Sequence, residues 1–244
     1  MKQIFVACAL ALAIGSFGQT KINFKSGINV SSLTSDLISE YEFDTFREAY
    51  IALGGSATSE VKNSVRVGFY LSAEADFYLN ETLFIRSGLK FFNTGDSYFF
   101  KTNDVVLVSS SGSESDERFK FRQRLGYFSI PVNIGKQVSD RVTLYGGFTP
   151  SINVSNVMRA SFFEADGDDV KEEWSKSDNP AEPRSMIILV NGGLNYLFPG
   201  GSVEYFIDFG FDYSLSSVYN DPTLTADFEN ANALNINIGF GMRL

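Results

Sequence analysis

Apolar and polar residues alternate one by one along most of this chain, and the C-terminal segment ALNINIGFGMRL shows the pattern most clearly. Every second residue from Leu234 to Leu244 is apolar, and the residues between them are Asn, Gly or Arg. Period-two alternation is typical of a β-strand whose two faces meet different environments. The same pattern predicts eight strands, over residues 20–30, 65–79, 83–94, 119–137, 141–155, 185–198, 202–215 and 233–244.

The connections between the predicted strands alternate strictly between long and short. The long ones cover residues 31–64, 95–118, 156–184 and 216–232, and the short ones cover residues 80–82, 138–140 and 199–201. The short connections are made of turn residues such as Asn, Asp, Pro and Gly. An antiparallel up-and-down sheet with all its tight turns at one end has this layout, and an even number of strands lets it close. The sequence therefore predicts an all-β fold, an eight-stranded antiparallel up-and-down β-barrel.

The residue types on the two faces distinguish a membrane barrel from a soluble one. A soluble barrel of the lipocalin kind would also alternate, but an eight-stranded interior is only just wide enough for side chains to fill. Hydrophobic residues make up 44% of this chain, too many for such an interior, and the opposite set is rich in Gly, Ser, Asn and Thr. Small polar residues inside and large apolar residues outside indicate contact with lipid. We therefore predict a transmembrane barrel with short periplasmic turns and long extracellular loops.

The first 18 residues have the features of a secretory signal peptide. Lys2 precedes an uninterrupted apolar run from Ile4 to Ile14, and small residues stand at Ser16 and Gly18. This run is too short to span a bilayer. We expect cleavage between Gly18 and Gln19, a barrel domain over residues 19–244, and a location in the outer membrane of a Gram-negative cell.

The charge balance and the missing histidine argue against two classes of function. The chain has a formal net charge of −9, whereas a nucleic-acid-binding surface must be basic, so no nucleic-acid partner is expected. It contains no histidine, the usual general acid or base near neutral pH, and no other catalytic motif is evident. We expect neither an enzyme nor a bound cofactor or structural metal.

Charged residues occur on the polar faces of several predicted strands and would point into the lumen. The candidate lumen charge network consists of Arg66, Glu74, Asp76, Arg86, Lys90, Glu204, Asp208 and Asp212. Such residues either line a polar path for a small solute or form ion pairs that hold the barrel closed. The narrow lumen and the near balance of signs favour the closed arrangement.

The fourth predicted strand shows an apparent change of parity, because Tyr127 and Phe128 are adjacent aromatics. A β-bulge at this point would turn Lys120, Arg122 and Arg124 into the lumen near the extracellular end.

The long connections are where specificity for a partner is expected. In the first, Phe46 and Tyr50 belong to a stripe at helical spacing that would pack across the barrel mouth or dock a partner. In the third, Trp174 is a candidate contact residue within an acidic stretch. Asp166, Asp168 and Asp169 could bind calcium, but the ligand pattern of an EF-hand is absent, so a solvated acidic loop is favoured.

Several segments together resemble a known family. These are FKSGINVSS, LFIRSGLKFFNTGDSY, LGYFSIPVNIGK, LYGGFTPSINVS and the final NIGFGMRL. They are similar to the small outer-membrane barrels called the PorT-like or porin-family β-barrel group, related in architecture to OmpA and OmpX. Residues Leu234 to Leu244 also resemble the C-terminal signal that such barrels present to the assembly machinery. The resemblance implies the fold and the location, and says little about activity.

From these observations we expect a monomeric barrel without catalytic activity, in contact with outer-membrane lipid. It would act through its extracellular loops in interaction or in envelope integrity. Two alternatives stay open at this point. One is an accessory component of a protein secretion complex, which the resemblance to PorT implies, and the other is a narrow porin-like channel for small solutes.

Overall fold

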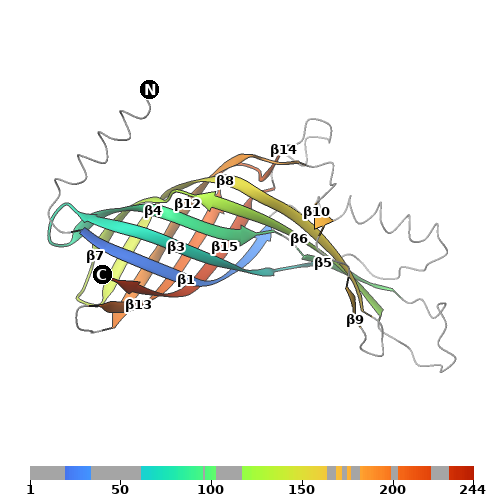
Figure 1. The fold of residues 1–244 in the computed structure, drawn as a ribbon, viewed down its shortest axis with the longest axis horizontal. Coiled ribbons are helices and arrows are strands. Elements are labelled where there is room, and N and C mark those ends of the chain that lie inside the picture. Colours follow the sequence, from blue (N-terminus) through green and yellow to red (C-terminus); the bar gives the residue numbers. More distant parts are fainter. Residues whose placement is uncertain are drawn as a thin grey trace.

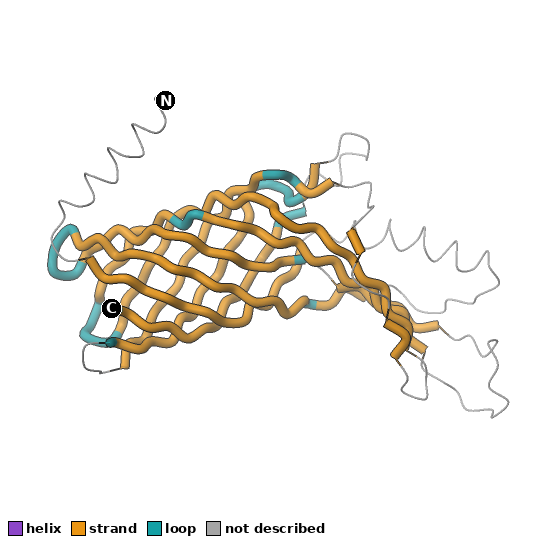
Figure 2. Tube along the Cα trace, in the orientation of Figure 1, coloured by secondary structure: helices purple, strands orange, loops and turns teal. Residues whose placement is uncertain are grey.

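The computed structural model describes residues 20–33, 62–95, 97–102, 117–163, 169–171, 175–176, 182–198, 203–220 and 231–244. Long stretches of antiparallel strand dominate it (Figures 1 and 2), and eight of them build the barrel. They are β1 (Thr20–Leu33), β3 (Arg66–Tyr78), β4 (Leu83–Thr94), β6 (Glu117–Ser129) continued by β7 (Val132–Gln137), β8 (Val142–Phe163), β12 (Met186–Phe198), β13 (Glu204–Ser214) and β15 (Ala233–Arg243). Within the described ranges, no helix is long and apolar enough to cross a membrane.

These strands form one closed antiparallel barrel. Each pairs with its neighbour along the chain, and β15 pairs with both β13 and β1, which joins the two ends of the sheet. The closure reaches the last residue, because the backbone N–H groups of Ile22 and Leu244 donate to each other's carbonyls at 3.1 and 2.9 Å. Proline has no N–H to donate, and Pro131 separates β6 from β7. The predicted eight-stranded up-and-down barrel is confirmed.

Side-chain hydrogen bonds hold two of the short turns. The carboxamide oxygen of Asn80 accepts from the backbone N–H groups of Thr82 and Leu83 at 2.9 and 2.8 Å. In the next turn, Ser139 Oγ accepts from the N–H of Val142 at 3.1 Å. Asn and Ser favour turns because their short side chains replace a backbone acceptor in this way. Both turns lie at the same end of the barrel as the C-terminus (Figure 1).

At the opposite end, part of the sheet continues well beyond the barrel (Figure 1). β5 (Ser97–Thr102) extends the line of β4 after Gly95, whose φ is 140°, and pairs with β6. β6 and β8 stay paired as far as Arg118 and Phe163. Short strands join this extension: β2 (Lys62–Ser64), β9 (Asp169–Lys171) and β10 (Ser175–Lys176), while β11 (Glu182–Pro183) pairs with β14 (Tyr219–Asn220).

The expectation that residues 95–118 and 156–184 are loops is therefore wrong in part, because strands occupy some of both connections. Beyond the barrel a strand no longer separates a lipid-like face from a lumen. The alternation that marks the barrel strands is then not required, and sequence patterning underestimates their length.

The outward faces of the barrel strands are apolar and the inward faces are buried. Along β15, for example, Ile236, Ile238 and Phe240 are exposed, while Asn235 and Asn237 are buried. Isolated soluble proteins rarely expose a continuous apolar surface of this kind. The side chains therefore have the inverted distribution of a barrel that is surrounded by lipid.

Candidate functional site: the charged lumen

The buried ion pairs of the lumen come from five strands. The lumen network, as we call it, consists of Lys25 on β1, Glu74 and Asp76 on β3, Arg86 and Lys90 on β4, Asp208 and Asp212 on β13, and Arg243 on β15. All eight side chains are buried. They face inward because each belongs to the set of alternate residues on its strand that is mostly polar.

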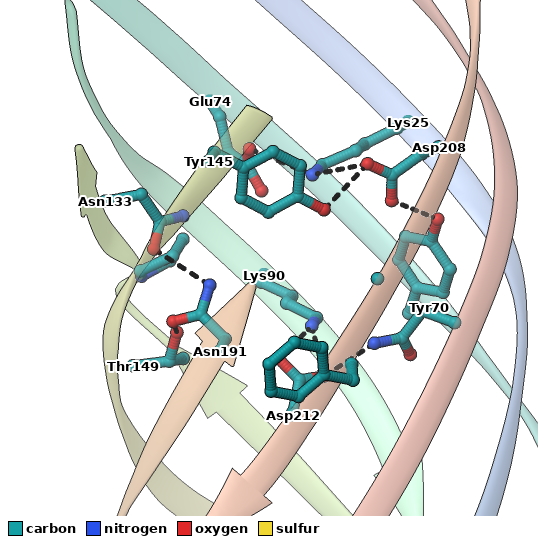
Figure 3. A pocket seen from close by; sticks show the side chains of 14 residues that line it. Lys25, Tyr70, Glu74, Lys90, Asn133, Tyr145, Thr149, Asn191, Asp208 and Asp212 are labelled. Carbon is teal, nitrogen blue, oxygen red and sulfur yellow. Dashed lines mark hydrogen bonds and ion pairs between the residues drawn. The ribbon is translucent and has the colours of Figure 1, made fainter. Parts of the chain in front are cut away.

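Asp208 is the acceptor at the centre of this network (Figure 3). The hydroxyls of Tyr70 and Tyr145 each donate to its carboxylate at 2.8 Å, and the Asn195 side-chain amide donates at 2.6 Å. The Nζ of Lys25 lies 3.4 Å from Asp208 and 3.2 Å from Glu74. Four donors from four strands thus converge on one buried carboxylate.

Arg86 forms a second centre with Asp76. The guanidinium donates to both carboxylate oxygens of Asp76, at 2.6 and 3.0 Å, and to the side-chain oxygen of Asn195 at 2.8 Å. Arg243 also donates to Asp76 at 3.2 Å and to Asn23 at 2.8 Å. Bidentate guanidinium–carboxylate pairs are strong and geometrically specific. This centre links β15 to β3 across β1.

Lys90 and Asp212 make a third centre closer to the long-loop end. Lys90 Nζ donates to the two oxygens of Asp212 at 3.0 and 2.7 Å, and Asn237 donates to the same carboxylate at 2.7 Å. At the opposite end, Glu204 pairs with Lys21 at 3.4 Å, and both side chains are about one-third exposed, at 36% and 33%. The ion pairs therefore run from the short-turn rim deep into the barrel.

The lumen network contains six of the eight charged residues that the sequence analysis singled out for the lumen, and Glu204 lies beside it at the short-turn rim, 3.7 Å from Arg243. Arg66 lies apart, near the long-loop end, where its guanidinium donates to the Thr94 carbonyl at 2.8 Å. Tyr70, Tyr145 and Asn195 are equally central but were not among the candidates. Their inward parity could have indicated them, because each stands on the polar phase of its strand.

Inward glycines make room for inward aromatic rings. A Cβ built on Gly239 would lie 2.1 Å from the Tyr70 hydroxyl, and one on Gly135 would lie 2.1 Å from the Phe84 ring. One on Gly241 would lie 2.3 Å from the Phe206 ring. The inward glycines thus leave space in which the aromatic rings of the lumen pack against the backbone. This explains why glycine is frequent on the polar faces of the strands.

We expect Gly239→Ala to lower the free energy of unfolding by about 1–3 kcal/mol, the usual cost of overpacking. The new methyl group would also meet the Ser26 carbonyl oxygen at 2.6 Å, so moving Tyr70 alone does not relieve the clash. The matched control is Gly146→Ala, whose Cβ would come no closer than 3.5 Å to its nearest neighbour. Urea unfolding in lipid vesicles compares the two. Equal stabilities would contradict the packing described here.

A second barrier, made of apolar side chains, closes the lumen toward the long-loop end. We call it the apolar plug, and it consists of Leu33, Tyr70, Phe92, Leu125, Tyr127, Ile187, Leu189, Val218, Tyr219, Ala231 and Ala233. Phe92 and Tyr127 stack in it with ring centroids 5.4 Å apart. The sequence analysis did not identify this cluster, because apolar residues at inward positions interrupt the simple alternation.

The apolar plug also explains the apparent parity change in the fourth strand. Leu125 and Tyr127 both face inward into the plug, so the parity of β6 does not change. A register shift does occur beside Tyr127, but the extra residue is Val154 on β8. Arg122 and Arg124 consequently face outward, and the expectation that a bulge turns them into the lumen is wrong.

A small polar cavity lies among the ion pairs of the lumen network (Figure 3). It is lined by Lys25, Tyr70, Lys90, Tyr145, Asn191, Asp208 and their neighbours. Asn191 donates to Asn133 at 2.8 Å and accepts from Thr149 at 3.1 Å. Within the described ranges, no three carboxylates lie close enough together to hold a metal ion. The cavity is polar and crowded, and its charged side chains are already paired.

The other candidate residues lie outside the described part of the chain. These are Phe46, Tyr50, Trp174, Asp166, Asp168 and the signal peptide over residues 1–18. Asp169 begins β9.

Taken together, a closed antiparallel barrel, an apolar outer surface and a salt-bridged interior define an outer-membrane β-barrel. The chain belongs to the outer membrane protein beta-barrel domain family, whose model matches residues 17–220. No curated protein matches the chain.

Solved structures of small outer-membrane proteins are similar to this chain. Ail, the attachment invasion locus protein of Yersinia pestis, solved in complex with the heparin analogue sucrose octasulfate, shares 14% identity with a TM-score of 0.42. The match covers 93% of this chain and all of Ail. Neisserial surface protein A shares 15% identity with a TM-score of 0.31, over 92% of this chain and 96% of that one. At these values the family assignment rests on the family model.

Proposed function

We propose that this protein is a non-conducting, non-catalytic outer-membrane barrel that acts through its extracellular side. The observation that carries the proposal is the closure of the lumen at two levels, by the lumen network and by the apolar plug. A solute would have to separate both barriers. The lumen then serves as a rigid support, and recognition falls to the parts beyond the membrane.

The energetics of the lumen network support a closed barrel. Arg86 and Arg243 are fully buried, at 0% and 2% exposure, and both are bonded to Asp76. Removing one partner of such a pair leaves a buried charge uncompensated and costs about 3–5 kcal/mol. Opening a path by moving Arg86 would break several of these bonds at once, so spontaneous opening is rare.

The extension formed by β5, β6, β8 and β9 supports an extracellular role. It carries an ordered sheet past the barrel rim on the side of the long connections (Figure 2). Connections supported by a rigid scaffold are the usual place for binding residues. We propose interaction or envelope integrity as the role, with the partner contacted through this extension and the loops beside it.

Planar bilayers test the closed lumen directly. We expect the purified protein to give no stable single-channel steps, and Arg86→Gln to give none either, because the apolar plug remains in place. A large-pore porin recorded under the same conditions serves as the positive control. Regular steps in the wild-type protein that change size in Arg86→Gln would favour the channel alternative.

Photo-crosslinking in intact cells tests the extracellular role. A photoreactive amino acid at Gly167, in the acidic connection, is compared with one at Glu81, in a periplasmic turn. We expect a defined crosslinked product from position 167 and none from position 81. A further substitution outside the loops should leave the product from position 167 unchanged. Products from Glu81 only would place the interaction in the periplasm and contradict the proposal.

The terminal strand supports the proposed contact with the assembly machinery. β15 closes the barrel against β1, and Leu244 completes its last backbone bonds. Before closure, the segment from Leu234 to Leu244 would present a free edge and an apolar face, the features that an assembly factor needs to bind a strand.

A further inference from the structure

The apolar outer band ends abruptly on β6 and β8. Phe128 and Ile152 form its last cross-strand pair in register, and both are exposed, as is the bulged Val154. The next outward pair is Gly126 and Ser155, which offers no apolar side chain. The continuous apolar band therefore ends at this height on this side of the barrel, and the next outward residue on β8, Val157, stands opposite Arg124.

Three arginines follow immediately beyond the band. Arg124 pairs in register with Val157, and Arg122 pairs directly with Arg159 on β8. Their outward orientation follows from Gln123 between them, which is buried and accepts a hydrogen bond from Tyr219 inside the barrel. Arg122, Arg124 and Arg159 are half-buried. They form one outward arginine cluster on two adjacent strands.

The height of the cluster matches the headgroup layer. Arg124 stands four residues beyond Phe128, which is about 13 Å along a strand and about 10 Å along the membrane normal at the usual tilt. Arginine side chains near a membrane boundary lie along the apolar surface and extend the guanidinium toward polar groups. This height would place Arg124 beside the phosphate groups of the outer leaflet, with Arg122 two residues further along the same strand.

The charge pattern also selects an anionic ligand. Arg122 and Arg159 stand directly opposite each other on adjacent strands, so one anionic group can contact both guanidinium groups. Guanidinium groups bind phosphate in bidentate geometry, which lysine does not match.

We propose that Arg122, Arg124 and Arg159 form a binding site for the phosphate groups of a phosphorylated lipid of the outer leaflet. The site goes beyond the proposed function and holds whatever partner the extracellular loops contact. It would fix the orientation of the extension relative to the membrane, because the lipid contacts β6 and β8 together.

The test measures binding of diphosphorylated lipid A to the refolded full barrel in neutral detergent. The main variant is Arg122→Gln/Arg124→Gln/Arg159→Gln. The matched control is Lys136→Gln/Arg141→Gln, which removes two exposed cations from the periplasmic end of the same side. We expect the triple variant to bind at least tenfold more weakly and the control to bind like the wild type. The affinity of the wild type for diphosphorylated lipid A should fall as the salt concentration is raised. The wild type should bind dephosphorylated lipid as weakly as the triple variant binds diphosphorylated lipid A.

Two results would overturn the proposal. One is equal binding of diphosphorylated lipid A by the triple variant and the wild type, and the other is equal binding of phosphorylated and dephosphorylated lipid. Circular dichroism and resistance to SDS without heating verify that each variant is folded. If the triple variant does not fold, the single variant Arg124→Gln replaces it, with an expected threefold loss, and unchanged binding in that variant contradicts the site.

Discussion

Asp208→Ala is expected to lower the free energy of unfolding by about 3–5 kcal/mol, as breaking a buried ion pair does. The change removes the acceptor of Tyr70, Tyr145 and Asn195 and one of the two partners of Lys25. All four donors would remain in the barrel interior without that carboxylate. Equilibrium unfolding by urea in lipid vesicles measures the difference.

Glu204→Ala is the matched control, because it removes a carboxylate from the same face of the same strand. Glu204 and its partner Lys21 are both about one-third exposed, so solvent screens that pair. Glu204 also lies 3.7 Å from Arg243, but Arg243 keeps its bonds to Asn23 and Asp76 when Glu204 is replaced. The expected loss is therefore below about 1 kcal/mol. A loss below 1 kcal/mol for Asp208→Ala as well would mean that Asp208 is solvated. That result would contradict a closed lumen and revive the channel alternative.

Ile238→Arg is expected to destabilise the folded barrel by about 2–4 kcal/mol and to reduce its yield in the membrane. Ile238 stands at the middle of β15, faces outward, and lies between Ile28 and Phe209 on the neighbouring strands. An arginine at this depth would contact hydrocarbon, where its cost is greatest. Unfolding in vesicles and the amount of folded protein in outer-membrane fractions measure the effect.

Met242→Arg provides the comparison on the same strand and the same face. Met242 is exposed near the short-turn end, where an arginine reaches the membrane interface and costs about 0–1 kcal/mol. The difference between the two variants therefore reports depth in the bilayer. Equal effects would show that the outward face of β15 does not contact lipid along its length.

The charged interior illustrates how far sequence patterning reaches. Alternation places Glu74, Asp76, Arg86 and Lys90 on one face of two strands joined by a tight turn, so their common orientation is predictable. Their partners are not. Lys25 meets Asp208, and Lys90 meets Asp212, through the curvature and stagger of a closed sheet, and these depend on the register of all eight strands together.

The two basic residues Arg122 and Arg124 illustrate the opposite case. Their orientation depends on which of the two paired strands, β6 or β8, carries the extra residue beside Tyr127. The sequence of β6 alone does not show whether the extra residue lies in β6 or in β8. The structure assigns that residue to Val154 on β8, which leaves β6 regular and turns both arginines outward. A bulge on β6 itself would have turned them inward.

By itself the sequence determined the class of fold, the number of barrel strands, the position of the tight turns and the faces that meet lipid and lumen. These follow from local alternation, because successive side chains of a barrel strand point in turn to the lipid and to the lumen. Only the tertiary structure decided which lumen charges pair, where the apolar plug closes the barrel, and how far β6 and β8 extend beyond it. Those features depend on contacts between strands distant in the chain, and no local pattern specifies them.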